Sequence, residues 1–390
     1  MDLIIIGTGM YVCGKDNTDY GTILPAVLSY IKKNNLIKNI HIVGTKRKSL
    51  IEIKKKYKIL SRKLKIKINI KFYPNDDNNQ KDGYKKILKS TNKFCPVIIS
   101  VPDHLHFKIV NDCMRHFKHT LVVKPFVKKY DEAQKILRIQ KKNKLLGLVE
   151  FHKRLDRQNI IIKDLINNNK IGKILSFNIE YSQKITIPKN NFIKWVRNTN
   201  LIYYLGVHYI DLIYFFTQAT PHRVSAVGQK NILKNNGVNV HDSIQLMLEW
   251  KLKDGSIFNS LFSLSWVDPE KNSARSVQNI KVIGTLGRII SDQKNRGLSI
   301  VNKYLESQDI NPDFNNFYSI NKNPYFFGYG IENVQSFLND ISNINKNKIS
   351  KYESLIGDRS SFKDASISTL VAESATKSLN NNGNWVKIKK

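Results

Sequence analysis

The chain has 390 residues, 41% of them hydrophobic, so it is long enough to bury one large or two ordinary cores. Lysine and arginine total 64 against 31 acidic residues, which gives a formal net charge of +33. No apolar run approaches the length of about 20 residues that a membrane-spanning helix needs. No basic region precedes an apolar segment at the N-terminus. We therefore expect neither a membrane protein nor a signal peptide.

The cysteines and lysines indicate which metals, nucleic acids or membranes the protein is expected to bind. Cys13, Cys95 and Cys113 form neither a disulfide pattern nor a metal-ligand spacing, so we expect no metal and a reducing, cytoplasmic compartment. The lysines are scattered among many Asn and Ile residues, which favours an AT-rich coding bias over a dedicated nucleic-acid-binding face. We expect no specific nucleic-acid or membrane partner. The positive field still attracts anionic ligands, such as a cofactor that carries phosphate.

Short apolar segments and amphipathic helices alternate through the first 150 residues. Ile23, Val27 and Ile31 recur at the spacing of one helical face. A lysine-rich helix follows near residue 53, another begins near residue 104, and a further one covers 130–142. Strands are predicted at residues 3–6, 40–43, 64–72, 97–101, 120–123 and 145–149. Buried strands separated by helices indicate a parallel sheet covered on both faces, so residues 1–150 are predicted to form a doubly wound α/β dinucleotide-binding domain, the Rossmann fold.

The pattern changes after about residue 157. Apolar and polar residues alternate over 175–181, 244–250 and 258–266, and Asp254-Gly255 supplies a hairpin turn. Helices are predicted at 159–168, 201–216 and 362–379. Strands without intervening helices indicate an antiparallel sheet. Residues 151–390 are therefore predicted to form an α+β domain.

A glycine turn follows the first strand. Gly7 and Gly9 fit the start of a dinucleotide-binding fingerprint, but Val12 stands where the third glycine belongs, and such an imperfect motif is weak on its own. The strand–helix alternation favours dinucleotide binding over a plain glycine turn. The next helix is expected after Gly21, which makes the loop unusually long and leaves Gly21 as the close-packing glycine. The residues predicted to approach the cofactor here are Gly7, Thr8, Gly9 and Met10.

The end of the second strand bears on the choice of cofactor. An Asp or Glu there binds the ribose 2′-hydroxyl of NAD, whereas this chain has Thr45, Lys46 and Arg47. A cationic loop with a hydroxyl group suits a 2′-phosphate, so we favour NADP over NAD. The alternative is that these residues reflect only the abundance of lysine in the chain.

Two segments at strand ends carry a family resemblance. "SVPDHLHFKIV" and "LVVKPF", together with the glycine turn, resemble the Gfo/Idh/MocA oxidoreductases. The resemblance extends over nearly the whole chain through "GKILSFNIEYS", "LGVHYIDLIYFF", "VIGTLGRI" and "VAESATKSLNNNG". It implies an N-terminal Rossmann domain and a C-terminal α+β domain with an open, mainly antiparallel sheet, which serves substrate binding and oligomerisation. Because such sheets commonly pair between subunits, it also implies a homodimer or homotetramer.

The resemblance implies a set of cofactor contacts after the fourth strand. The segment matches the family's T-P-N-x-x-H motif, which lies beside the nicotinamide ribose. The residues that this assigns are Val101, Pro102, Asp103 and His106.

The resemblance also implies catalytic positions. Lys124 and Pro125 match the family's E-K-P motif, with Val123 where Glu usually stands. His208 matches the histidine of its D-x-x-x-H motif, with Tyr204 in place of Asp. The two missing carboxylates would orient the lysine and tune the histidine, so the site is either specialised or inactive in the ordinary sense.

The chemistry of hydride transfer supports these positions independently. Oxidation of an alcohol needs a base for the hydroxyl proton and a cation for the developing alkoxide. His208 and Lys124 fit these roles, and Tyr204, one helical turn before His208, can relay the proton or hold the substrate. The alternative for His208 is a core or capping role in an apolar helix. Candidates for contact with an anionic or sugar substrate, with surface or packing roles as the alternative, are Arg154, Trp195 and Arg197.

These observations predict an NAD(P)-dependent oxidoreductase that transfers hydride between a nicotinamide cofactor and a hydroxyl or carbonyl group of a sugar or sugar derivative. The lost Asp and Glu positions keep a second hypothesis open, a catalytically inactive dinucleotide-binding regulator. A third is an NAD-dependent glycosidase of the same fold that oxidises its substrate transiently.

Overall fold

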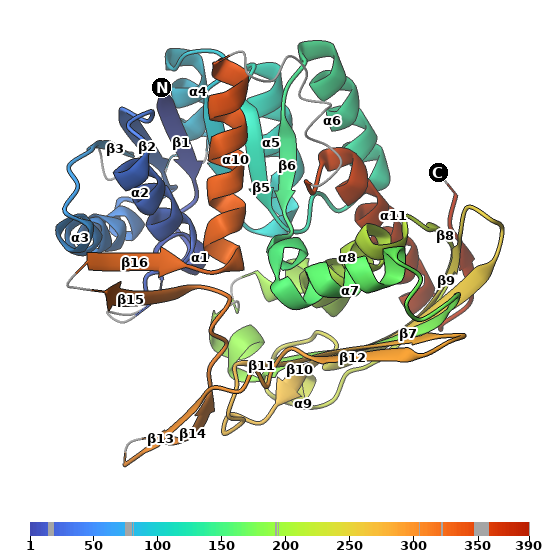
Figure 1. The fold of residues 1–390 in the computed structure, drawn as a ribbon. Helices are drawn as coiled ribbons and strands as arrows, with labels where there is room; N and C mark the ends of the chain where they lie inside the picture. The colour runs from blue at the N-terminus through green and yellow to red at the C-terminus, as the bar shows by residue number, and fades with distance from the viewer. Residues whose placement is uncertain are drawn as a thin grey trace. The chain divides into compact units, whose positions relative to one another are not determined.

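The computed structural model describes residues 1–14, 19–74, 80, 82–191, 193, 195–303, 305–320, 323–346 and 359–389. The chain divides into two units (Figure 1). Unit 1 consists of Met1–Phe126, Asp131–Leu155 and Asp313–Lys363. Unit 2 consists of Val127–Tyr130, Asp156–Pro312 and Asp364–Lys390. Among the described residues, no helix has both the length and the apolar character to cross a membrane.

A six-stranded sheet forms the centre of unit 1. All of its neighbouring strands pair in parallel, in the order β3-β2-β1-β4-β5-β6. That order is the one found in dinucleotide-binding folds, so the predicted doubly wound sheet is confirmed. The strands are β1 (Asp2–Ile6), β2 (Asn39–Val43), β3 (Asn69–Tyr73), β4 (Pro96–Ile99), β5 (His119–Val123) and β6 (Gly147–Glu150).

Helices connect the strands of unit 1. The helices before residue 155 are α1 (Met10–Cys13), α2 (Ile23–Lys33), α3 (Arg47–Leu64), α4 (Gly83–Ser90), α5 (His106–Arg115) and α6 (Tyr130–Asn143), with the 3₁₀ turns η1 (Asp103–Leu105) and η2 (His152–Leu155). Helix α2 begins at Ile23, directly after Gly21 and Thr22, as predicted. Helix α4 is absent from the sequence-based prediction, because its eight residues offer only one short apolar stripe, of which Tyr84, Ile87 and Leu88 are buried.

The segment 313–363 returns to unit 1. Helix α10 (Tyr329–Asn345) packs along α2, where Tyr30 donates a hydrogen bond to the carbonyl oxygen of Leu338 at 3.3 Å (Figure 1). The hairpin of β15 (Asn316–Ile320) and β16 (Asn323–Phe327) lies against the same helices. A single domain boundary, at residue 150, is predicted from the sequence. The structure instead assigns part of the C-terminal half to unit 1, because the apolar face of α10 completes the core beneath β1 and α2.

The predicted strand over residues 64–72 is wrong in its first half. Leu64 is the last residue of α3, and Lys65, with φ of 52°, ends that helix in the left-handed conformation. Strand β3 begins only at Asn69. Leu60 and Leu64 are four residues apart and are both buried on one face of α3. Leu64 therefore belongs to the helical pattern, although together with the apolar residues that follow it resembles the start of an alternating strand.

A seven-stranded sheet forms the centre of unit 2, in the order β12-β11-β7-β10-β9-β8-β17. Among the described residues, neighbouring strands of this sheet pair antiparallel, except that β7 and β10 pair in parallel. The predicted mainly antiparallel sheet is therefore confirmed. The strands are β7 (Ile174–Lys184), β8 (Thr220–Gln229), β9 (Ser243–Lys251), β10 (Ile257–Asp268), β11 (Ser276–Gly284), β12 (Arg288–Asp292) and β17 (Val386–Lys387). The turn between β9 and β10 contains Asp254-Gly255, as predicted, with Gly255 at φ of 87°.

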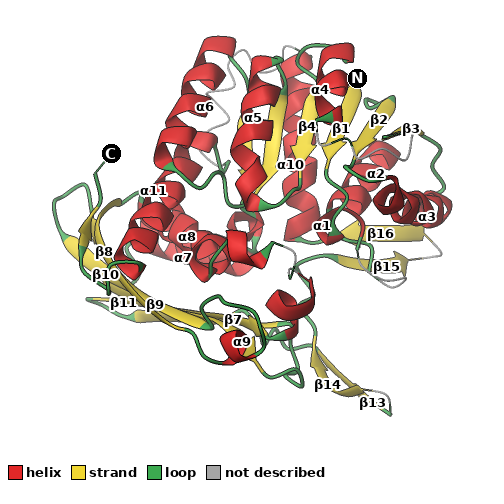
Figure 2. Ribbon diagram, turned by 180° about the vertical axis from the view of Figure 1, so that it is seen from behind, coloured by secondary structure: helices red, strands yellow, loops and turns green. Residues whose placement is uncertain are grey.

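Helices α7 (Arg157–Asn167) and α8 (Val207–Thr217) lie on one face of this sheet (Figure 2). Phe177 of β7 stacks on Phe216 of α8, with ring centroids 6.4 Å apart. Alternate residues along β10 are buried, and the ring of Phe258 lies 5.5 Å from that of Phe177. The remaining elements of unit 2 are η3 (Ile187–Asn191), η4 (Val196–Asn198), η5 (Ile202–Gly206), α9 (Ile232–Asn235), β13 (Ser299–Asn302) and β14 (Leu305–Asp309), while α11 (Phe362–Leu379) begins at the boundary between the units.

A buried ion pair fixes the start of α7. The two guanidinium nitrogens of Arg296 lie 3.0 and 2.5 Å from the two carboxylate oxygens of Asp156, and both side chains are almost completely buried. Asp156 also caps α7 by accepting a hydrogen bond from the backbone N–H of Gln158 at 3.2 Å. Burial makes each charge depend on its partner, because neither can be solvated by water.

Replacing Asp156 with Asn is expected to lower the free energy of unfolding by about 3 kcal/mol, because the Arg296 charge stays buried without its counter-ion. Chemical denaturation followed by tryptophan fluorescence measures the change. Arg223→Gln is the control, since the Arg223–Glu249 pair lies at the surface and is worth less than about 1 kcal/mol. Equal losses in the two variants would show that the buried pair has no special role.

Candidate functional site

The glycine turn after β1 combines a crowded glycine with an open one. Gly7 has φ of 118°, and a Cβ atom built on it would lie 1.9 Å from the carbonyl oxygen of Ser100, so no other residue fits. Gly9 precedes α1, and a Cβ atom there would meet nothing within 4 Å. The turn therefore holds β1 close to β4 and leaves space beside its backbone at Gly9. Thr8 and Met10 complete the predicted turn.

The loop between Gly9 and α2 is long, as predicted, and contains the short helix α1. Residues 15–18 lie outside the described residues. Gly21 has φ of 68°, and a Cβ atom there would lie 2.5 Å from the backbone nitrogen of Gly14. Gly21 is thus a close-packing glycine whose neighbour is the end of α1.

The loop after β2 is basic and exposed. Thr45, Lys46 and Arg47 all face solvent, and α3 begins at Arg47. The backbone N–H of Gln80 donates to the carbonyl oxygen of Thr45 at 3.2 Å, which anchors the loop from one side. The exposed loop thus carries one hydroxyl group and two cationic side chains, and its contact with a cofactor stays a prediction.

The segment after β4 contains a fully buried histidine. The Nδ1 atom of His106 lies 2.6 Å from the carbonyl oxygen of Pro125, and its Nε2 atom lies 2.9 Å from that of Val101. His106 therefore ties the ends of β4 and β5 together through their backbones. Asp103 is also buried, in η1, whereas Val101 and Pro102 are half-buried. The predicted contacts of these residues with the cofactor are not tested by this geometry.

Lys124, directly after β5, has the most perturbed amine at this edge of the sheet. Removal from water lowers its pKa from 10.5 to about 8, and the charges of Asp103 and Glu150 act in the opposite direction. A lysine whose pKa is close to neutrality changes charge readily. Such groups cluster at functional sites.

Glu150, the last residue of β6, was not predicted as a site residue. It is almost completely buried, and the Tyr11 hydroxyl donates a hydrogen bond to its Oε1 atom at 2.7 Å. The Nδ1 atom of His152 lies 2.8 Å from the same oxygen. Burial and the Glu150 charge hold the pKa of Tyr11 well above its ordinary value, so this hydroxyl keeps its proton. A carboxylate at the end of an apolar strand is the signal that predicts such a residue.

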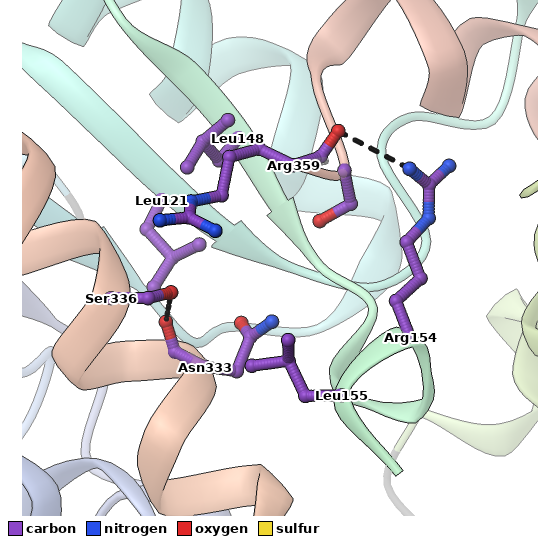
Figure 3. A pocket seen from close by; sticks show the side chains of 8 residues that line it. Leu121, Leu148, Arg154, Leu155, Asn333, Ser336 and Arg359 are labelled. Atoms are coloured by element: carbon purple, nitrogen blue, oxygen red, sulfur yellow. Dashed lines mark hydrogen bonds between the residues drawn. The ribbon is translucent and has the colours of Figure 1, made fainter. Parts of the chain in front are cut away.

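Arg154 lies inside unit 1. Only 3% of it is exposed, and its guanidinium donates to the carbonyl oxygen of Arg359 at 3.2 Å (Figure 3). It lines a small cavity of about 10 Å³, the size of one water molecule, together with Asn333 and Ser336. This geometry gives Arg154 a packing role in unit 1, and its contact with substrate stays a prediction.

The predicted residues of unit 2 lie around α8. His208 is almost completely buried in the first turn of α8, with its ring 6.3 Å from that of Tyr181. Tyr204 lies in the π-helical turn η5 and is half-buried, and its ring is 6.1 Å from that of Trp195. Arg197 is exposed and donates to the carbonyl oxygen of Gly237 at 3.2 Å.

The parallel sheet brings the predicted residues of unit 1 to one edge. The glycine turn, the Thr45 loop, the Val101 segment and Lys124 follow the carboxyl ends of strands, and Glu150 is itself the last residue of a strand. Ligands of doubly wound sheets bind at this edge. His208, Tyr204, Trp195 and Arg197 belong to unit 2. Within the described ranges, no group of three His, Cys, Asp or Glu side chains is arranged to hold a metal ion.

Two protein-family descriptions match the chain. "Oxidoreductase family, NAD-binding Rossmann fold" matches residues 33–151, and "GFO/IDH/MocA C-terminal domain" matches residues 160–290. Together the two matches cover more than half of the chain and fall on the two sheets described above.

Individual proteins resemble the chain in part of the sequence or in the fold. An uncharacterized oxidoreductase of Schizosaccharomyces pombe is 30% identical over 166 residues, which are 41% of this chain and 43% of that protein. A scyllo-inositol 2-dehydrogenase (NADP(+)) of Bacillus subtilis is 26% identical over 116 residues, which are 30% of this chain and 32% of that protein. The chain thus matches less than half the length of each of these relatives.

The structure of a scyllo-inositol dehydrogenase from Lactobacillus casei with bound NAD(H) and scyllo-inositol is similar over the whole chain. Its TM-score is 0.67, with 99% of this chain and 98% of that chain covered, at 14% sequence identity. At this identity the likeness shows a shared fold.

The two glycines of the turn are expected to respond oppositely to alanine. Gly7→Ala should lower the free energy of unfolding by about 3 kcal/mol, because its Cβ atom meets the Ser100 carbonyl. Gly9→Ala should change stability by less than about 0.5 kcal/mol, because its Cβ atom meets only open space. Denaturation curves of both variants measure these changes. If Gly9→Ala also leaves the affinity for NADPH unchanged, the space beside Gly9 is not a cofactor site.

Proposed function

Because the chain belongs to the Gfo/Idh/MocA family of oxidoreductases, with its NAD-binding Rossmann fold, we propose that it is an NAD(P)-dependent dehydrogenase or reductase acting on the CH–OH group of a sugar or sugar derivative. The observation that carries this proposal is the set of groups at the carboxyl edge of the six-stranded sheet. There, an open glycine turn and a basic loop lie on the same edge as a lysine whose pKa is about 8.

The residues of this edge fit a dinucleotide. The space beside Gly9 admits a pyrophosphate against the backbone, which a side chain at that position would fill. The residues proposed to hold the cofactor are Gly7, Thr8, Gly9, Met10, Thr45, Lys46, Arg47, Val101, Pro102, Asp103, His106 and Lys124. When bound, the nicotinamide accepts or supplies the hydride of the reaction.

We assign the proton chemistry to the chain's own side chains. The imidazole of His208 takes the proton of the substrate hydroxyl, since histidine is the general base that works near neutral pH. The ammonium of Lys124 stabilises the developing alkoxide by charge and hydrogen bonding. Tyr204 holds the substrate hydroxyl or relays its proton. With a pKa of about 8, Lys124 is mostly charged at pH 7 and loses this function as the pH rises through 8.

The exposed loop after β2 supports NADP as the preferred cofactor. Thr45, Lys46 and Arg47 offer a hydroxyl and two cations to a 2′-phosphate and no carboxylate to a ribose hydroxyl. The Bacillus subtilis relative is named as an NADP(+) enzyme, whereas the Lactobacillus casei structure contains NAD(H). The preference for NADP therefore rests on the loop itself.

Polyols and sugars are the proposed substrates. Two of the similar proteins act, by their names, on inositols. Trp195 and Arg197 in unit 2 offer an aromatic face and a cation, the groups that bind sugar rings and anionic substituents. A homodimer or homotetramer and a cytoplasmic location remain predictions.

Turnover with a panel of polyols, sugars and sugar acids tests the function, with NADPH or NADH formation followed by absorbance. We expect saturable oxidation of at least one of these compounds. Lys124→Ala and His208→Ala should each lower kcat about 100-fold or more, a far larger effect than the one on the affinity for cofactor, to which Lys124 also contributes. Lys128→Ala, on a neighbouring lysine that bonds the Asn198 carbonyl, is the control. Saturable cofactor binding without turnover of any compound would indicate a regulator instead.

Thr45→Asp should lower the ratio of kcat/KM for NADP to that for NAD about 10-fold or more, because the new carboxylate repels a 2′-phosphate and accepts a ribose hydroxyl. Steady-state kinetics with both cofactors gives the ratio. Thr220→Asp, an exposed position in unit 2, introduces the same charge elsewhere and should leave the ratio unchanged. A wild-type protein that already prefers NAD would contradict the assignment of this loop.

A further inference from the structure

Strand register places a carboxylate beside the residue that precedes Lys124. In the pairing of β5 with β6, Val123 is opposite Glu150. Directly opposed residues of parallel strands project to the same face of a sheet. Position 123 is the one at which the resemblance to the family leads us to expect a glutamate. The carboxylate that Val123 lacks is therefore present one strand away, at the same level of the sheet.

Glu150 is held in place by groups from two other elements. Tyr11 of α1 donates to its Oε1 atom at 2.7 Å, and the Nδ1 atom of His152 in η2 lies 2.8 Å from that atom. The His152 ring is in turn stacked on that of Tyr329 in α10, with centroids 5.5 Å apart and planes 19° apart. A buried carboxylate with two hydrogen-bond donors keeps one position, so its field on nearby groups is fixed.

The charged and titratable groups around Lys124 come from several elements. Asp103 in η1 and Glu150 in β6 both act on Lys124 electrostatically and favour its charged form. His106 in α5 bonds the carbonyl oxygen of Pro125, the residue after Lys124. Burial acts against the charged form and has the larger effect. Without its carboxylates, Lys124 would lose its proton at a still lower pH.

We propose that Glu150 acts as the positioning residue of Lys124. Its buried carboxylate, on the neighbouring strand, replaces the carboxylate that is missing at position 123. Tyr11 couples this carboxylate to the glycine turn, because it lies in the helix that begins directly after Gly9. The role of Lys124 in the reaction rests on the proposed function, but the effect of Glu150 on its charge does not.

The charge of Lys124 can be measured on the protein without cofactor. Acylation by acetic anhydride, which modifies only the neutral amine, is followed across pH by peptide mass spectrometry, and the pH midpoint of labelling gives the pKa of each lysine. We expect a midpoint of about 8 for Lys124 in the wild-type protein. Glu150→Gln removes the charge but keeps an acceptor for Tyr11, and it should lower the midpoint by about one unit.

Moving the carboxylate from position 150 to position 123 distinguishes an effect of its charge on Lys124 from an effect of local packing. Adding Val123→Glu to Glu150→Gln should return the Lys124 midpoint towards that of the wild type. Val123→Glu alone should raise the midpoint, and this variant provides the test if Glu150→Gln does not fold. The matched control is Glu52→Gln, at an exposed residue 3.3 Å from Lys55, which should leave the Lys124 midpoint unchanged.

An unchanged Lys124 midpoint in folded Glu150→Gln, or in Val123→Glu, would overturn the proposal, since Glu150 would then only hold Tyr11 and His152. Turnover gives a separate readout. The fall in kcat above pH 8 should move to lower pH in Glu150→Gln, by the same shift as the labelling midpoint. A wild-type protein without turnover would contradict the proposed function and leave the labelling result to decide on Glu150.

Discussion

The approach of Gly7 to Ser100 is the constraint on which the rest of unit 1 depends. The carbonyl oxygen of Ser100 occupies the place of a side chain at Gly7, and backbone hydrogen bonds of 2.8 Å join Gly7 to Val43 and Ser100 to Ile6. The ends of β1, β2 and β4 are thereby fixed together. Because the whole sheet is parallel, everything that follows a strand end, from the glycine turn to Glu150, meets at one edge.

Electrostatics gives this edge its chemical character. The chain carries a large positive charge, which favours phosphate-bearing ligands at any exposed basic loop. At Lys124 the balance is different, because burial opposes the ammonium and the carboxylates Asp103 and Glu150 support it. The result is a lysine that is charged at neutral pH and close to losing its proton. That state suits a group that must stabilise an alkoxide without binding it permanently.

The sequence predicts the strands of unit 1 well because buried parallel strands are short apolar runs, as at β1, β4 and β5. It fails where one pattern continues into another, as at Leu64, where the end of a helix resembles the start of a strand. It also does not reveal where α10 packs. The buried residues Ile331, Val334 and Leu338 define an apolar face, but their spacing does not identify α2 as its partner.

The residues of the candidate site can likewise be predicted from the sequence only in part. Glycines, basic loops and Lys124 are visible in the sequence because each follows a strand end. Glu150 also ends a strand, but its relation to Val123 is not visible in the sequence, because that relation exists only in the register between two strands, 27 residues apart in the chain. The motif comparison at position 123 considers only β5, whereas the charge state of Lys124 depends on groups of both β5 and β6. Departures from a family motif need to be judged in three dimensions.

Titration of the wild-type protein with NADPH and with NADH, followed by nicotinamide fluorescence, is the most direct test of dinucleotide binding at the carboxyl edge of the six-stranded sheet. We expect saturable binding of one nucleotide per chain, tighter for NADPH because of the basic loop formed by Thr45, Lys46 and Arg47. The absence of saturable binding of either nucleotide at millimolar concentration would contradict it, because the carboxyl edge of the sheet would then not be a dinucleotide site.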